Sequence, residues 1–216
     1  MITEYGYDVF FTITALCIVL ILGSYFFVSH IVLKSAVIGV AGLFFLFTAY
    51  FFRDPERIAP SGDRLILSPA DGTVISITEV DEQTFIHGKA VQISIFMSPL
   101  NVHVNRNPVS GTVRYMRHIP GEYFAAFEEK ASLKNEQTHI GIETPYGRVF
   151  FKQIAGFVAR RIVCPLKEGD SVAAGRRFGM IKFGSRVDIF VPASATINAA
   201  LQQKTVAGET VVATVH

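Results

Sequence analysis

The pair Gly184-Ser185 places a hydroxyl directly after a glycine, at the point where two strand-like runs meet. Glycine has no side chain to block an approach to its carbonyl carbon, and it tolerates backbone angles that other residues avoid. A serine hydroxyl one residue later can attack that carbonyl if a base removes its proton. Gly-Ser pairs are also common in ordinary turns. The pair alone therefore leaves two interpretations open, a backbone that cleaves itself and a plain turn.

Two further segments carry side chains capable of acid-base chemistry in turn-like settings. Asp71 lies in the segment 68–72 (Ser-Pro-Ala-Asp-Gly), where an aspartate either caps the turn or partners a histidine. His103 lies in a loop after the segment 96–99 (Phe-Met-Ser-Pro), a setting in which most histidines are simply solvated. Neither residue identifies an active site by itself. Three other histidines lie in polar contexts, and nothing besides their residue type makes them catalytic candidates: His87, His118 and His139.

Composition argues against several other kinds of site. The net charge is +2 and the basic residues are dispersed among acids, so we expect no nucleic-acid partner. Cys17 lies within an apolar run and Cys164 stands alone before a proline, which gives neither a disulfide pattern nor zinc-ligand spacing. We therefore expect no metal site, and we expect both cysteines to be bystanders.

A β-domain must position these residues. Beyond residue 53 the hydrophobic pattern has a period of two, in short runs rich in β-branched and aromatic residues that are bounded by Gly, Pro, Asn or Asp. The runs are 73–80, 91–97, 112–116, 148–154, 179–182 and 187–191. They predict a mainly β fold, an antiparallel β-domain. Residues 122–134 have a helix-like composition, although an ordered loop fits them nearly as well.

Part of this domain resembles the hammerhead of lipoyl- and biotinyl-type modules. The segment 165–175 followed by 179–181 has their turn-strand-turn pattern. Such modules carry a modified lysine at a hairpin tip, and Lys182 lacks the Met-Lys or Asp-Lys-Ala setting expected there. We therefore predict a hammerhead/lipoyl-like portion, with a carrier role as the weaker interpretation.

Two long apolar runs precede the β-domain. Residues 9–28 are uncharged and meet the roughly 20 residues that a membrane-spanning helix needs, and residues 35–52 are about the minimum length for a second span. The start lacks the charged region and the small-residue cleavage site of a signal peptide, so we favour a transmembrane helical hairpin over residues 1–52. Basic residues follow the second run, whereas the connecting loop holds only Lys34, which predicts that residues 53–216 face the cytoplasm. These basic residues are Arg53, Arg57 and Arg64.

Five motifs occur in order between about residues 51 and 192. They are Phe51-Phe52-Arg53-Asp54-Pro55; Ser68-Pro69-Ala70-Asp71-Gly72; Phe96-Met97-Ser98-Pro99 with Val102-His103-Val104-Asn105-Arg106; Gln153-Ile154-Ala155-Gly156 with Ala159-Arg160-Arg161-Ile162-Val163; and Phe183-Gly184-Ser185-Arg186-Val187-Asp188. Each motif is modest alone, but five in order are hard to obtain by chance. Together they resemble the short bacterial form of phosphatidylserine decarboxylase.

The resemblance implies a self-processing, pyruvoyl-dependent enzyme. In such an enzyme Ser185 Oγ attacks the carbonyl of Gly184 and converts the amide into an ester, and elimination then leaves a dehydroalanine that hydrolyses to a pyruvoyl group. The chain is thereby cut between residues 184 and 185, and the pyruvoyl group heads the fragment 185–216. By motif position, Asp71 orients a histidine that deprotonates Ser185.

The identity of that histidine follows less directly from the resemblance. Long-form members of the family have two histidines three residues apart after the Ser-Pro pair, and those positions are His103 and Arg106 here. His103 is then the candidate base for cleavage and the candidate proton donor for turnover. Arg106 cannot act as a base near neutral pH, but its guanidinium suits the phosphate or carboxylate of a substrate.

For turnover, the resemblance implies decarboxylation of phosphatidylserine to phosphatidylethanolamine and CO2, a step of phospholipid biosynthesis. The pyruvoyl cofactor, covalently derived from Ser185, forms a Schiff base with the substrate amine and takes up the electrons released as carbon dioxide leaves. The expected partners are phosphatidylserine in the bilayer and the chain's own fragments 1–184 and 185–216 as a heterodimer, and a homodimer of these also fits. The hairpin implies a multi-pass protein of the inner membrane.

Two alternatives from other classes stay open. A membrane-anchored hammerhead-like adaptor or carrier would keep its chain intact and have no catalytic activity. A membrane-tethered zinc peptidase would need a His-x-His pair with a further histidine and aspartate at ligand spacing, and the segment 103–105 does not supply that pair. An intact mass distinguishes the adaptor or carrier from the decarboxylase.

Overall fold

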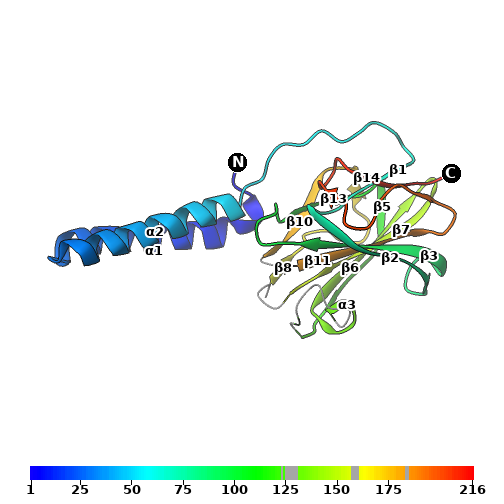
Figure 1. Cartoon of the computed structure of the whole chain (residues 1–216). Helices are drawn as coiled ribbons and strands as arrows, with labels where there is room; N and C mark the ends of the chain where they lie inside the picture. The colour runs from blue at the N-terminus through cyan, green and yellow to red at the C-terminus, as the bar shows by residue number, and fades with distance from the viewer. Residues whose placement is uncertain (123, 125–130, 157–160, 183–184) are drawn as a thin grey trace. The chain divides into compact units, whose positions relative to one another are not determined.

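The computed structural model describes the whole chain except residues 123, 125–130, 157–160 and 183–184 (Figure 1). It divides into two compact units, Met1–Pro55 and Glu56–His216. The first unit is helical and the second is built from strands.

The first unit is a pair of helices. A short 3-10 turn, η1 (Glu4–Gly6), leads into α1 (Tyr7–Phe27), and α2 (Ile31–Phe51) follows after a brief connection. Both are long and apolar enough to cross a membrane, and only 11% of the most apolar window of each is buried. A core helix of a soluble protein would be largely buried, so length, composition and exposure together indicate association with a membrane.

The second helix begins earlier than predicted, at Ile31 rather than at residue 35, and so includes Lys34. The Lys34 ammonium lies 5.4 Å from the centroid of the Tyr25 ring. A lysine near a helix end can keep its aliphatic stem along apolar surface while its charge reaches the interface, so one charge does not end the helix. The two ends of the unit are tied by backbone hydrogen bonds, from Thr3 N to Phe52 O at 2.9 Å and from Asp54 N to Met1 O at 2.7 Å.

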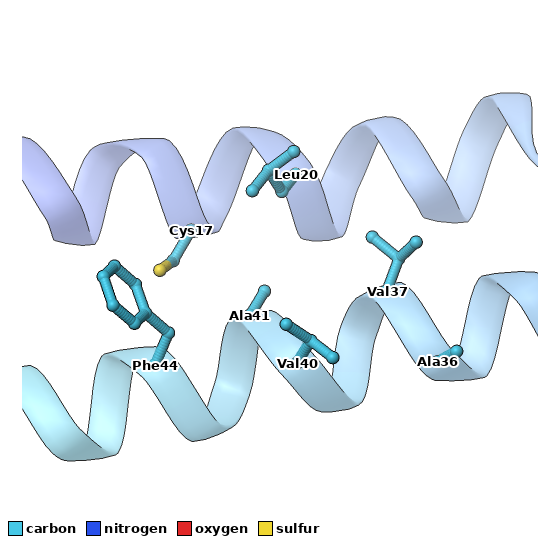
Figure 2. A pocket seen from close by; sticks show the side chains of 7 residues that line it. All are labelled: Cys17, Leu20, Ala36, Val37, Val40, Ala41 and Phe44. Carbon is cyan, nitrogen blue, oxygen red and sulfur yellow. The ribbon is translucent and has the colours of Figure 1, made fainter.

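A groove runs between the two helices (Figure 2). Its lining is wholly apolar apart from one thiol and comes from both helices. The lining residues are Cys17, Leu20, Ala36, Val37, Val40, Ala41 and Phe44. No titratable carboxylate, amine or imidazole lines it, so the groove offers apolar surface and no site for the chemistry predicted above.

The second unit is built on one large antiparallel sheet. Its strand order is β13-β2-β3-β11-β7-β6-β5-β9, and every neighbouring pair in it is antiparallel. The strands are β2 (Gly72–Glu82), β3 (Gly88–Met97), β5 (Gly111–Ile119), β6 (Gln137–Thr144), β7 (Gly147–Ile154), β9 (Ser171–Val172), β11 (Ser185–Pro192) and β13 (Lys204–Thr205).

Two small sheets complete this unit. One has the order β1-β14-β12 and the other β4-β10-β8. Their strands are β1 (Leu65–Leu67), β14 (Val211–Thr214), β12 (Thr196–Ile197), β4 (Val104–Arg106), β10 (Arg177–Lys182) and β8 (Arg161–Val163). In Figure 1, β10 and β14 are drawn above the long strands β2, β3 and β11. Side chains of β1, β10 and β14 share one hydrophobic core with β3 and β11, so the small sheets cover one face of the large sheet.

The period-two pattern explains which side chains form that core. Ile93 and Ile95 of β3, Val187 and Ile189 of β11, and Phe151 of β7 all belong to it and are fully buried. The residues between them point to the other face, since successive side chains of a strand alternate. There a second, smaller cluster forms around Phe85, Ala90, Phe150 and Phe190. The prediction of a mainly β, antiparallel domain that follows a two-helix hairpin in the sequence is confirmed.

Several segments of the β-domain differ from the predicted pattern. The short strands β1, β4, β8, β12, β13 and β14 were not among the predicted runs. Strand β6 (Gln137–Thr144) was not predicted, because its outward positions are polar and glycine, although Ile140 and Ile142 alternate on the core side. The helix-like segment 122–134 contains a short helix, α3 (Ala131–Lys134), and most of the rest of it lies outside the described residues.

Candidate active site

Ser185 is the first residue of the central strand β11 and is fully buried. It lies opposite Met97 of β3, and its Oγ donates to the Met97 Sδ at 3.3 Å. A thioether is a weak acceptor, so this contact orients the hydroxyl without holding it strongly. Gly184, the other residue of the predicted scissile bond, lies outside the described residues.

A pair of buried amides lies beside Ser185. Asn105 Nδ2 donates to the Pro69 carbonyl at 3.3 Å and lies 3.7 Å from the same Met97 sulfur, and Asn105 Oδ1 accepts from Gln153 Nε2 at 2.9 Å. Asn105 and Gln153 are both fully buried. Gln153 follows Val149 and Phe151 on the inward side of β7 and lies opposite Val187 of β11. Three neighbouring strands therefore place a methionine, a serine and a glutamine at one end of the apolar core.

His103 precedes β4 and is fully buried, in contrast to the solvated histidine that loops usually hold. Its Nδ1 lies 3.0 Å from the Asn101 carbonyl oxygen. A carbonyl can only accept, so Nδ1 carries the hydrogen and Nε2 is the nitrogen that can take up a proton. The His103 carbonyl accepts from Ile181 N at 3.4 Å, which places this histidine beside the end of β10, the strand that leads to residues 183 and 184.

Asp71 lies in the turn before β2 and is held by Arg57. Arg57 donates to both carboxylate oxygens at 2.8 Å, and Ala207 N donates to Oδ1 at 2.8 Å. These are the hydrogen bonds of its carboxylate among the described residues, so in this structure Asp71 contacts an arginine and not His103. The strand register places Asp71 and Ser185 on either side of β3, at the same end of the sheet. Two strand spacings of about 4.8 Å put their backbones roughly 10 Å apart.

Arg106, at the end of β4, is buried and packs against glycine turns. Its Nη1 donates to the Gly175 carbonyl at 2.9 Å. A Cβ on Gly208 would come within 2.8 Å of the Arg106 side chain, and both Gly175 and Gly208 have a positive φ that favours glycine. The described contacts of Arg106 therefore join β4 to two turns.

The face of the sheet opposite Ser185 carries a buried charged cluster. Arg186 Nε donates to Asp188 Oδ1 at 2.5 Å, Arg186 Nη2 donates to Ser94 Oγ at 2.7 Å, and Gln92 Nε2 donates to Asp188 Oδ2 at 3.0 Å. These hydrogen bonds from β3 and β11 surround the ion pair, and a buried ion pair needs such partners to offset its desolvation. This cluster fixes the residue directly after Ser185.

Another strand on that opposite face carries His139. Burial, reinforced by the nearby Lys152 ammonium and opposed by Glu82, lowers the pKa of His139 to about 4. Its Nε2 lies 2.8 Å from Gln137 Oε1 and its ring meets Phe150 edge to face. His118 is largely exposed, near Glu136. The fold therefore buries His103 beside the end of β10, whereas His139 lies on the opposite face of the sheet and His118 is exposed on β5, three strands from β11.

Comparison with known proteins decides the family. The family model described as phosphatidylserine decarboxylase matches residues 44–213. A protein of Chlorobium phaeobacteroides named phosphatidylserine decarboxylase proenzyme is 45% identical over 212 residues, which is 98% of this chain and 99% of that protein. Proteins of the same name from Chlorobium phaeovibrioides and Chlorobium luteolum are each 46% identical over 215 residues, 99% of this chain and 96% and 99% of theirs.

The chain belongs to the phosphatidylserine decarboxylase family. This confirms the resemblance drawn from the five motifs. The described parts of three of the five motifs meet at one end of the core of this phosphatidylserine decarboxylase fold. They contribute Met97, His103 and Asn105 from the first, Gln153 from the second and Ser185 from the third.

Three residues of this region were not singled out from the sequence. Asn105 and Gln153 were quoted only as parts of motifs, although Gln153 shows a detectable signal, a polar residue at an inward position of an alternating apolar strand. Arg57 was considered only as a positive charge near the membrane span. Its pairing with Asp71 depends on tertiary contacts that have no local sequence signal. Among the described residues, no group of histidine, cysteine and acidic side chains could hold a metal ion.

Proposed function

We propose that this chain is a self-processing, pyruvoyl-dependent phosphatidylserine decarboxylase that converts phosphatidylserine to phosphatidylethanolamine and CO2. Family membership and the proenzyme names of relatives that match along their full length support this activity. The observation that supports self-processing best is the buried hydroxyl of Ser185 at the start of the central strand β11, whose described hydrogen bond goes to the Met97 thioether.

In the proposed cleavage, His103 Nε2 takes the proton of Ser185 Oγ, and Oγ forms a bond to the Gly184 carbonyl carbon. The Gly184 carbon then releases the Ser185 nitrogen, which gains a proton, and the amide becomes an ester. Elimination frees the Gly184 carboxylate and leaves a dehydroalanine, and its hydrolysis releases ammonia and yields the pyruvoyl group. The tautomer of His103 fits this role, because the Asn101 carbonyl holds Nδ1–H.

Asp71 has a proposed part in the same step, since an aspartate can hold an imidazole in the required tautomer and orientation. In the described structure its carboxylate binds Arg57, so this role requires the carboxylate to release Arg57 or to act through the turn that it anchors. Arg106 has a proposed role in substrate binding. Its described contact with Gly175 favours a supporting role for the turns around the site.

For turnover, a pyruvoyl group supplies a carbonyl that condenses with the substrate amine and withdraws electrons as CO2 leaves. The residues of this chain supply the surroundings. The buried core around Met97 excludes water from position 185, and His103 Nε2 is the proposed donor of the proton that replaces the lost carboxyl group.

The two fragments of the cleaved chain are expected to stay together. Strand β11 (Ser185–Pro192) pairs along its length with β3 and in its first part with β7, both of which belong to the fragment 1–184. A dimer of such heterodimers is compatible with this arrangement. The hairpin, with Arg53 and Arg64 after its second helix and Lys34 near the start of that helix, supports a multi-pass protein of the inner membrane whose β-domain faces the cytoplasm.

The test is the mass of the detergent-extracted protein. Active protein should give fragments 1–184 and 185–216, and the smaller should resist sequential N-terminal degradation because a pyruvoyl group has no amine. Ser185→Ala should leave one intact, inactive chain, since it removes the nucleophile. A fully active preparation that shows a single intact mass would refute the proposal.

The identity of the base is tested by a pair of histidine variants. His103→Ala should slow cleavage by roughly 100-fold or more, the contribution of a general base, whereas His118→Ala should mature at the normal rate. His118 is the matched control because its side chain is 54% exposed, lies near Glu136, and belongs to β5, three strands from β11 in the large sheet. Normal maturation of His103→Ala together with slow maturation of His118→Ala would reverse the assignment.

A further inference from the structure

The buried side chain of Gln153 holds an acceptor that the described fold leaves without a donor. Gln153 is fully buried, and its Oε1 has no hydrogen-bond partner among the described residues. Buried polar atoms are nearly always paired, so an unpaired carbonyl oxygen in a core calls for a donor, and a bound ligand can supply one.

The orientation of this amide follows from its neighbours. The Pro69 carbonyl can only accept, so the Asn105 atom 3.3 Å from it is the amide nitrogen, Nδ2. Asn105 Oδ1 is then the atom that faces Gln153, and it accepts from Gln153 Nε2 at 2.9 Å. This leaves Oε1 as the unpaired atom of Gln153.

The unpaired oxygen belongs to a side chain near position 185. Gln153 lies opposite Val187, and Ser185 is two residues away along β11 on the same face. Diagonal neighbours of this kind have Cα atoms about 7 to 8 Å apart, within reach of a long side chain. Asn105 completes the connection, because it binds Gln153 and also contacts the Met97 sulfur that accepts from Ser185 Oγ.

We propose that Gln153 Oε1 accepts a hydrogen bond from the amine nitrogen of the substrate as that nitrogen reacts at position 185. This inference rests on the proposed function. The amine is the one group of a phosphatidylserine headgroup that donates hydrogen bonds, whereas its ionised carboxylate and phosphate only accept. A neutral carbonyl acceptor in a buried site therefore selects the amine end of the headgroup and repels the anionic groups.

Reductive trapping with an amine that cannot be decarboxylated tests this role. Short-chain phosphatidylethanolamine is incubated with cleaved enzyme and sodium cyanoborohydride, and the intact mass of the fragment 185–216 is followed over time. Condensation of the amine with the ketone releases one water, and the hydride with one proton then gives a stable secondary amine. Gln153→Met should still be cleaved but should be trapped about 10- to 100-fold more slowly, equivalent to about 1.4 to 2.8 kcal/mol.

Gln137→Met is the matched control. Gln137 is also buried, on the neighbouring strand β6, and its Oε1 lies 2.8 Å from His139 Nε2. The same substitution there should leave trapping unchanged. Gln153→Glu keeps an acceptor oxygen in place of Oε1, and in its protonated form it also keeps a donor to Asn105 Oδ1, so it should be trapped faster than Gln153→Met. If thermal melting shows that Gln153→Met does not fold, the trapping rate of Gln153→Glu relative to the wild-type chain tests the role of Gln153.

The outcomes separate this inference from the function on which it rests. A wild-type chain that is neither cleaved nor trapped would refute the proposed function itself. A cleaved wild-type chain and a Gln153→Met variant that are trapped equally fast would overturn the role of Gln153 alone. A folded Gln153→Met that stays uncleaved would place Gln153 in self-cleavage and would overturn its proposed role in binding the substrate amine. A folded Gln153→Glu that is trapped as slowly as Gln153→Met would overturn that role as well.

Discussion

Arg57→Met should destabilise the β-domain substantially, because it removes the cation that neutralises a buried carboxylate. The Arg57 and Asp71 side chains are only 8% and 12% exposed, and two hydrogen bonds of 2.8 Å join them. Removing one partner of a buried pair costs about 3 to 5 kcal/mol. Because the Ala207 N–H still donates to Asp71, we expect a cost at the lower end of this range, about 3 kcal/mol. For a domain of this size that corresponds to a fall of about 6 to 12 °C in Tm.

The assay is thermal melting of the full chain in detergent, in a Ser185→Ala background so that every molecule is uncleaved. Glu56→Gln is the matched control. Glu56 is the neighbouring residue and binds Arg177 at the same distance, 2.8 Å, but its side chain is 76% exposed. Exposed pairs of this kind contribute little, so Glu56→Gln should leave Tm nearly unchanged.

A double variant tests whether the pair itself is responsible. Arg57→Met with Asp71→Asn removes both charges and should recover much of the lost stability, since no uncompensated charge stays buried. A change in Tm below about 2 °C for Arg57→Met, or a double variant whose loss is the sum of the two single losses, would refute the reasoning. Either result would mean that the carboxylate reaches solvent or another donor when Arg57 is lost.

The pKa of His139 is about 4 in the fold and about 6.5 when unfolded, so the unfolded chain binds the proton first and stability should fall as pH drops from 6.5 to 4, by about 1.4 kcal/mol at pH 5.5. His139→Gln should flatten that part of a plot of Tm against pH, and an unchanged slope would show that other groups cause it. Deleting residues 1–50 should leave self-cleavage intact but lower turnover of phosphatidylserine in vesicles much more than turnover of a short-chain, soluble phosphatidylserine. Equal losses on both substrates, compared at matched amounts of cleaved enzyme, would mean that the hairpin shapes the site.

The strands could be predicted because burial on one face leaves a local pattern. Strand β3 places Ile93, Ile95 and Met97 on the core side and polar residues between them, and the period of two is visible in ten residues. The same rule missed β6, whose two isoleucines alternate with histidine and glycine on a face that is also covered. Glycine there lies under the Phe85 ring, a contact that sequence cannot reveal.

The candidate site was predictable in its residue types but not in its contacts. Ser185 and His103 can be picked out from the sequence because a hydroxyl can act as a nucleophile and an imidazole as a base. The amide pair of Asn105 and Gln153 joins positions 48 residues apart. Its existence depends on the register of β7 against β11 and on the packing of β4 over the large sheet, and both are set by long-range contacts.

The position of Ser185 at the start of a central strand explains how a cut chain can remain one domain. All eight residues of β11 pair with β3, and five of them also pair with β7, so cleavage before Ser185 removes no strand pairing from the sheet. Arg186 is fixed on the opposite face by Asp188 and Ser94. A new chain end at residue 185 would therefore begin one residue from a buried ion pair, on the core face beside Met97 and Gln153. A terminus held in this way can present a reactive group to a substrate without fraying, which a cut placed in an exposed loop would not allow.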